Sequence, residues 1–270
     1  GAEEWLEYIF ANKMPKAIGR ISLVHMLSLN GGVRAEFTVY KTGPQSYYLV
    51  SAGAFETHDH DYLFKLVPKD GSVNIQRVTT QTGVLVLAGP RSRDVLQKLT
   101  DTDLSNDNFK WLTGKKINVG YANAEALRVN FVGELGWELH HPIEMQNYIF
   151  DQLMDAGAEF EIIPFGIRAM DSMRLEKSYR LIPREMSIEY SAYESGLDRF
   201  VKLDKENDFI GKSALKEWQD RGPSNGFVTL EVLGVVDADA RGSEAIYKDG
   251  EVVGRATSGG YGWRCEKSLA

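Results

Sequence analysis

Strand-like and helix-like runs alternate irregularly along this chain of 270 residues, without the regular strand–helix–strand repeat from which a parallel sheet is built. The clearest strand signal lies at residues 33–40, where apolar and polar side chains alternate with the period of two of a half-buried strand. Residues 21–27 and 46–51 read as further strands, and Gly31-Gly32 turns the chain into the middle one. The sequence therefore predicts an α+β fold with mostly antiparallel strands.

The same periodicities predict the remaining elements. Helices are expected at the amphipathic N-terminus, from Pro90 onward, and at residues 55–66, 142–156, 165–179 and 210–220. Strands are expected at residues 73–79, 83–88, 116–121, 124–132 and 136–140. Residues 180–205 are rich in charge and tyrosine, and we expect them to form an irregular connector across the surface.

A cluster of breaker residues, RGPSNG at 221–226, divides the chain. Beyond it the pattern is all-β, with a strand at residues 227–232 and a hairpin at 247–253 that turns at Asp249-Gly250. We therefore assign residues 1–205 to the main domain, 206–221 to a helical connector and 222–270 to a smaller β domain. This last domain has too few strands to close a barrel, so we expect it to be truncated. We also expect residues upstream, because the chain opens inside a helix.

Composition narrows the class of protein. The hydrophobic fraction of 43% and the charged fraction of 26% are ordinary for a globular chain, and the net charge of -7 argues against a nucleic-acid partner. The single cysteine, Cys265, excludes an internal disulfide framework and a cysteine-rich zinc site. No apolar run approaches the roughly 18 residues of a membrane span, and no signal-peptide pattern is present. The expected location is cytoplasmic, or the mitochondrial matrix in a eukaryote.

Common cofactor motifs are missing. No Gly-x-Gly-x-x-Gly opens a helix after a strand, and Gly211-Lys212-Ser213 lacks the upstream glycine of a phosphate-binding loop, so this chain shows no FAD, NAD or ATP site. His58 and His60 do not share a helix face, which favours an exposed surface over a metal site. His140-His141 reads either as a strand-end pair or as a source of a catalytic histidine.

Glu138 follows a glycine and Trp137, at the start of a predicted strand. A carboxylate beside a flat aromatic wall suits a heterocycle with two adjacent N–H donors, such as a pterin or a guanine, because it accepts two parallel hydrogen bonds. The alternative is an ordinary hairpin, in which Gly133 to Gly136 form the turn and Trp137 fills the core.

Other charged residues allow two interpretations. Glu36 alternates with the apolar side of its strand, so its carboxylate faces either a cavity or bulk solvent. Arg168, Asp171 and Arg174 follow one another at i, i+3 spacing, which favours an ion-pair ladder over ligand contact.

Five motifs in order resemble signatures of the glycine-cleavage T-protein (aminomethyltransferase) superfamily. They are GGVRAEFTV (31–39), LAGPRSR (87–93), GELGWE (133–138), MRLEK (173–177) and DFIGKSAL (208–215). TSGGYG (257–262) and EKSLA (266–270) resemble, within it, the folate-binding C-terminal region of dimethylglycine and sarcosine dehydrogenases.

The resemblance implies a cloverleaf of antiparallel-sheet subdomains around a tetrahydrofolate cavity, followed by a β-barrel-like domain. It places the catalytic carboxylate, Glu36, near the folate nitrogens that receive the one-carbon unit, where many relatives carry Asp. Many relatives likewise carry Tyr at Phe131. It assigns folate contacts to Glu138, Phe131, Trp137, Arg168, Arg174, Tyr179 and Tyr193. No metal is expected.

The implied activity is transfer of a methylene group to tetrahydrofolate from an iminium derived from an N-methyl amine, or from an aminomethyl donor. The expected partners are the small amine, folate, and a flavoprotein domain or carrier protein, with FAD supplied only by a separate or missing domain. Two alternatives remain open: a free-standing aminomethyltransferase of the glycine cleavage system, and a non-catalytic folate-binding protein of the same fold.

Overall fold

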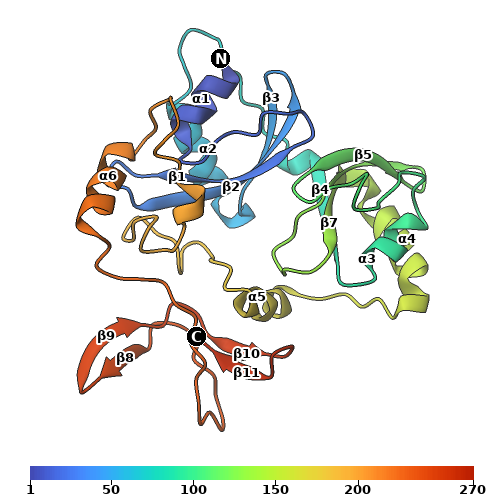
Figure 1. Cartoon of the computed structure of the whole chain (residues 1–270). Helices are drawn as coiled ribbons and strands as arrows, with labels where there is room; N and C mark the ends of the chain where they lie inside the picture. The colour runs from blue at the N-terminus through green and yellow to red at the C-terminus, as the bar shows by residue number, and fades with distance from the viewer.

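The computed structural model describes residues 1–270, and its N-terminal part contains a three-stranded antiparallel sheet (Figure 1). The sheet consists of β1 (Ile21–Leu27), β2 (Val33–Gly43) and β3 (Ser46–Val50), in that order. α1 (Ala2–Ile9) and α2 (Glu56–Lys65) contribute to the core on one face of this sheet. The alternation predicted for residues 33–40 is confirmed, since every second side chain is buried.

A four-stranded antiparallel sheet follows, in the order β4-β7-β6-β5. Its strands are β4 (Thr82–Ala88), β5 (Gly114–Val119), β6 (Ala122–Leu127) and β7 (Gly136–Pro142). α3 (Ser92–Gln97) and α4 (Gln146–Gly157) pack on one face through the largest core cluster of the chain. The other face lies toward the first sheet, which it meets at Tyr40 and Leu127.

α5 (Ile167–Glu176) follows the two sheets, and the connector, residues 177–211, leads from it toward the C-terminal segment. The irregular stretch after α5 includes the 3₁₀ turn η5 (Asp198–Phe200) and ends before α6 (Lys212–Arg221). Leu197, Val201 and Phe209 of this stretch pack against the ends of β1 and β2 in a third core cluster. The connector is therefore part of the folded body, as well as a link across its surface.

The C-terminal segment forms two separate two-stranded sheets (Figure 1). One pairs β8 (Ala245–Lys248) with β9 (Glu251–Arg255), and the other pairs β10 (Gly260–Gly262) with β11 (Lys267–Leu269). The hairpin predicted at residues 247–253 is confirmed. No helix of the chain combines the length and the apolar character needed to cross a membrane.

Several predicted elements were wrong or misplaced. Residues 73–79 form no strand, because Val73 and Ile75 pack against the core of the first sheet without a hydrogen-bonded partner strand. Residues 227–232 form no strand beyond an isolated bridge between Glu231 and Leu269. The predicted helix at 142–156 begins as α4 only at Gln146, because Pro142 ends β7 and a 3₁₀ turn, Ile143–Met145, intervenes.

Candidate functional site

Glu36 projects from the face of β2 that lies opposite the core of the first sheet. In the antiparallel register it stands directly across from His25 of β1, and its Oε2 lies 2.8 Å from His25 Nε2. The histidine side chain is 2% exposed and the glutamate side chain 26%. Glu36 therefore combines a buried hydrogen-bond partner with access to solvent or a ligand.

Glu138 has a similar arrangement on β7. Its Oε2 lies 3.3 Å from Nε2 of His140, and Nδ1 of that ring lies 3.1 Å from the hydroxyl of Tyr48 on β3. Burial raises the pKa of the Tyr48 hydroxyl, and the charges of Glu138 and Glu125 act in the same direction. Of the two interpretations of His140, the structure shows a buried strand histidine that contacts a candidate ligand-binding carboxylate.

Of the two interpretations of Trp137, the one in which it fills the core is confirmed, and Trp137 does not form an aromatic wall beside Glu138. The two residues are consecutive on a strand, so their side chains leave opposite faces of the sheet. Trp137 is 0% exposed and lies in the core under α3 and α4, where its ring is 6.0 Å from that of Phe109. The apolar neighbours of Glu138 on its own face are its two cross-strand partners, Val86 of β4 and Leu127 of β6.

Two other predicted aromatic residues are brought together. The rings of Phe131 and Tyr179 stack with centroids 5.8 Å apart and planes inclined by 26°. Tyr193 lies apart from this pair, half-buried against the third core cluster, and burial raises its pKa. The sequence separation of Phe131 and Tyr179 gives no signal of their contact.

The two predicted arginines have different environments. Arg174 is 1% exposed, with Nε 2.7 Å from Asp171 Oδ1 and Nη1 2.9 Å from Glu185 Oε2. Its Nη2 donates to Ser258 Oγ at 2.7 Å, so it joins α5, the connector and the C-terminal segment. Arg168 is exposed and forms no ion pair, so only the Asp171–Arg174 part of the predicted ladder exists.

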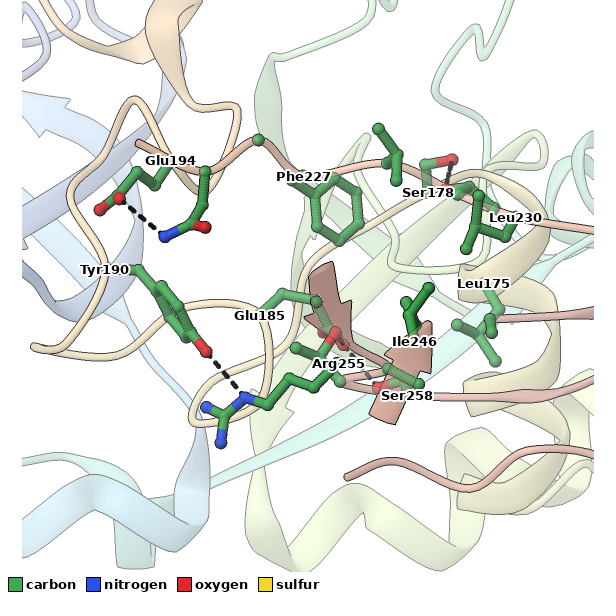
Figure 2. A pocket seen from close by; sticks show the side chains of 18 of the residues that line it. Leu175, Ser178, Glu185, Tyr190, Glu194, Phe227, Leu230, Ile246, Arg255 and Ser258 are labelled. Atoms are coloured by element: carbon green, nitrogen blue, oxygen red, sulfur yellow. Dashed lines mark hydrogen bonds between the residues drawn. The ribbon is translucent and has the colours of Figure 1, made fainter. Parts of the chain in front are cut away.

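A cavity of about 680 Å³ lies where the C-terminal segment meets α5 and the connector (Figure 2). Arg174, Tyr179 and Phe227 are among the residues that line it. In Figure 2 the Arg255 side chain reaches toward Tyr190, and its Nε donates to the tyrosine hydroxyl at 2.8 Å. This cavity combines aromatic surface with charged groups, but neither Glu36 nor Glu138 lines it.

A second cavity of about 790 Å³ follows the free edge of β4. It is mostly apolar, and Val86, Phe165 and Met173 contribute to its wall. Because Val86 stands opposite Glu138 in the sheet, this cavity borders the face that carries the carboxylate. Glu138 itself is not among the residues that line it.

No metal ligand set is present: the chain contains no group of three or more His, Cys, Asp or Glu side chains that could hold an ion. The arrangement instead offers hydrogen-bond acceptors. Hydrogen bonds within the protein engage only the Oε2 atoms of Glu36 and Glu138. Their Oε1 atoms can accept hydrogen bonds from a ligand that carries N–H groups or positive charge.

Sequence reasoning missed His25 and Tyr48. The signal for His25 was available, because pairing residues 21–27 with 33–40 in an antiparallel register places it opposite Glu36. Tyr48 reaches His140 only through the packing of the two sheets, so no local pattern could have identified it.

Comparison with known proteins agrees with this architecture. Residues 1–205 match the GCVT N-terminal domain, and residues 226–270 match the glycine cleavage T-protein C-terminal barrel domain. The crystal structure of glycine cleavage system aminomethyltransferase T from Bartonella henselae superposes with a TM-score of 0.84 at 22% identity, covering 99% of this chain and 71% of that one. The fold is therefore that of an aminomethyltransferase, with the barrel domain only partly present.

Relatives in sequence include dehydrogenases of methylated amines and aminomethyltransferases. Human mitochondrial dimethylglycine dehydrogenase is 42% identical over 98% of this chain, which spans only 30% of that protein. An aminomethyltransferase from Koribacter versatilis is 30% identical over 98% of this chain and 70% of its own length. The chain therefore belongs to the glycine-cleavage T-protein family, which also includes this region of dimethylglycine and sarcosine dehydrogenases.

Proposed function

We propose that this chain binds tetrahydrofolate and promotes transfer of a one-carbon unit to it, as the folate module of a dimethylglycine or sarcosine dehydrogenase-like enzyme. The observation that carries the proposal is the match of residues 1–205 to the GCVT domain together with 42% identity to dimethylglycine dehydrogenase. Members of the aminomethyltransferase family generally use tetrahydrofolate. The two carboxylates with unengaged oxygens fit such a ligand.

Glu138 is the proposed contact for the pterin edge. A carboxylate that is 21% exposed, held by a buried histidine and bordered by Val86, can accept two parallel N–H bonds while the ring rests on apolar surface. Phe131 and Tyr179 are proposed to offer their stacked rings to another part of the folate, and Arg174 to hold the pocket walls together without contacting the ligand.

Glu36 is the proposed catalytic carboxylate. Tetrahydrofolate, when bound, supplies the nitrogen nucleophiles that accept the carbon, and the smaller amine leaves. The donor carries positive charge as an iminium, and a fixed carboxylate stabilises that charge as the carbon moves. Holding two reactants in one orientation also lowers the barrier, because translational freedom is lost on binding rather than in the reaction.

The proposal also concerns the one-carbon donor and where it is produced. The chain shows no flavin motif, so oxidation of an N-methyl amine would take place on a flavoprotein domain elsewhere. In a eukaryote we place the protein in the mitochondrial matrix, following the mitochondrial relatives. The free-standing aminomethyltransferase is the second candidate, favoured by the match over 70% of the Koribacter protein.

The first test is calorimetric titration of the whole chain with tetrahydrofolate. We expect micromolar binding that Glu138→Ala weakens by roughly 10- to 100-fold, the range of a charge-assisted hydrogen bond. Glu144→Ala is the matched control, because Glu144 is exposed just after the same strand and forms no ion pair. No binding by the folded wild-type chain would contradict the proposal.

A further inference from the structure

We infer that His25 is the positioning residue for Glu36, fixing its carboxylate for the transfer step without itself touching a ligand. The inference rests on the proposed function for its catalytic meaning, whereas the hydrogen bond on which it depends can be tested separately. The family-like motif that contains Glu36, residues 31–39, does not include His25, which lies on the preceding strand.

The register of the β1–β2 pair places the two side chains next to each other. His25 and Glu36 are direct cross-strand partners, so their side chains leave the same face of β1 and β2 and stand side by side. The distance of 2.8 Å between Nε2 and Oε2 is that of a good hydrogen bond. Because both residues belong to paired strands, backbone hydrogen bonds on either side hold the geometry.

Burial differs across the pair in the way that a positioning role requires. The connector covers the imidazole, with the Phe200 ring 5.3 Å from it and inclined by 55°. The histidine side chain is 2% exposed, whereas the carboxylate is 26% exposed. A ligand can therefore reach Glu36 but not His25.

The imidazole has one polar contact within the protein. Its Nδ1 is buried and has no hydrogen-bond partner, so Glu36 is the only group that its ring nitrogens engage. A buried N–H without an acceptor is more costly than a lone pair without a donor, so the proton belongs on Nε2, facing the carboxylate. Nε2 then donates to Oε2 and leaves Oε1 available.

A purely structural role for His25 predicts a different set of partners. His141, which is equally buried on β7, engages both ring nitrogens, with Nδ1 2.9 Å from Leu139 O and Nε2 2.9 Å from Gln146 Oε1. His25 instead directs its single polar contact at a part-exposed acid. The comparison gives a matched control within the same chain.

The hydrogen bond is tested by ¹⁵N NMR of the imidazole nitrogens in the whole chain, without any ligand. We expect His25 to carry its proton on Nε2, and Glu36→Leu to shift the proton toward Nδ1 because the acceptor is gone. A wild-type ring protonated only at Nδ1 overturns the inference, whether or not the chain binds folate.

The catalytic consequence is tested with tetrahydrofolate and an iminium formed from sarcosine and formaldehyde, measuring methylenetetrahydrofolate above the uncatalysed rate. We expect His25→Leu to lower the rate at saturation at least tenfold while the calorimetric Kd for tetrahydrofolate changes less than twofold. His25→Gln, which places an amide N–H near the former Nε2, should recover part of the rate. His25→Leu combined with Glu36→Gln should be no slower than Glu36→Gln alone.

Different outcomes separate the two proposals. A wild-type chain that neither binds tetrahydrofolate nor accelerates transfer overturns the proposed function. Wild-type transfer that His25→Leu leaves unchanged, or lowers no more than His141→Leu after correction for the folded fraction, overturns the positioning role of His25 alone.

Discussion

Arg174 and Glu185 form an ion pair, with Nη1 2.9 Å from Oε2, in which both side chains are 1% exposed. The same carboxylate accepts hydrogen bonds from Ser258 and Thr257 at 2.6 and 2.8 Å through its other oxygen. α5, the connector that follows it and the distant C-terminal segment therefore converge on one buried charge pair. This pair fixes the wall of the cavity in Figure 2, where α5 and the C-terminal segment meet.

Removing one member of this pair should be strongly destabilising. Arg174→Ala leaves Glu185 buried without its main counter-charge, and the expected loss is about 3–5 kcal/mol in the free energy of unfolding. Urea denaturation measures it. Arg168→Ala on the exposed side of the same helix is the control and should change stability by less than about 0.5 kcal/mol. Equal losses for the two variants would contradict the assigned roles.

Trp137 should matter for stability and not for folate affinity. Trp137→Ala opens a cavity in the core below the second sheet, at an expected cost of about 3–5 kcal/mol. The milder Trp137→Phe should leave the calorimetric Kd for tetrahydrofolate within twofold of wild type. Val86→Ala, on the face that carries Glu138, should weaken binding several-fold with little loss of stability. The reverse pattern would show that Trp137 contacts the ligand.

Acid stability should depend on Glu3. Its hydrogen bond with Lys41, assisted by Tyr47 and Lys16, lowers its pKa from the ordinary 4.5 to about 2. A lowered pKa stabilises the folded state above about 4.5, and that contribution is lost as the pH falls toward about 2. Glu3→Gln should therefore reduce stability at neutral pH and flatten its dependence on pH across this window. Unfolding curves measured from neutral pH downward check this, and unchanged curves would contradict it.

The turn before β2 should not tolerate a side chain at Gly32. An added Cβ would lie 2.2 Å from the carbonyl oxygen of Ile188, so the turn and the connector would have to separate. We expect Gly32→Ala to cost about 1–3 kcal/mol, the range of an overpacked site. Gly53→Ala, where an added Cβ meets nothing within 4 Å, is the control for thermal denaturation. A Gly32 variant as stable as the Gly53 variant would show that the connector gives way freely.

Local pattern was sufficient for much of the architecture. The alternation at residues 33–40, the Asp249-Gly250 turn and the amphipathic N-terminal helix each specify their own geometry, because a period of two, a tight turn and a helix stripe are properties of neighbouring residues. The resemblance of five ordered motifs correctly indicated the family. Residues 73–79 were misread because a strand also needs a partner, which their own residues cannot reveal. Of the strand predicted at 227–232, only residues 230–232 pair, with the last three residues of the chain.

The positions of the site residues depended on tertiary structure more than the secondary-structure elements did. The sequence by itself determined that Glu36 and Glu138 lie on strands with alternating faces, and that the family is the glycine-cleavage T-protein family. Only tertiary structure decided that Trp137 faces the helices, that Phe131 stacks on Tyr179, and that His25 is covered by Phe200. The physical reason is that each of these outcomes depends on which face of a sheet another element covers, and that is set by packing between segments distant in the chain.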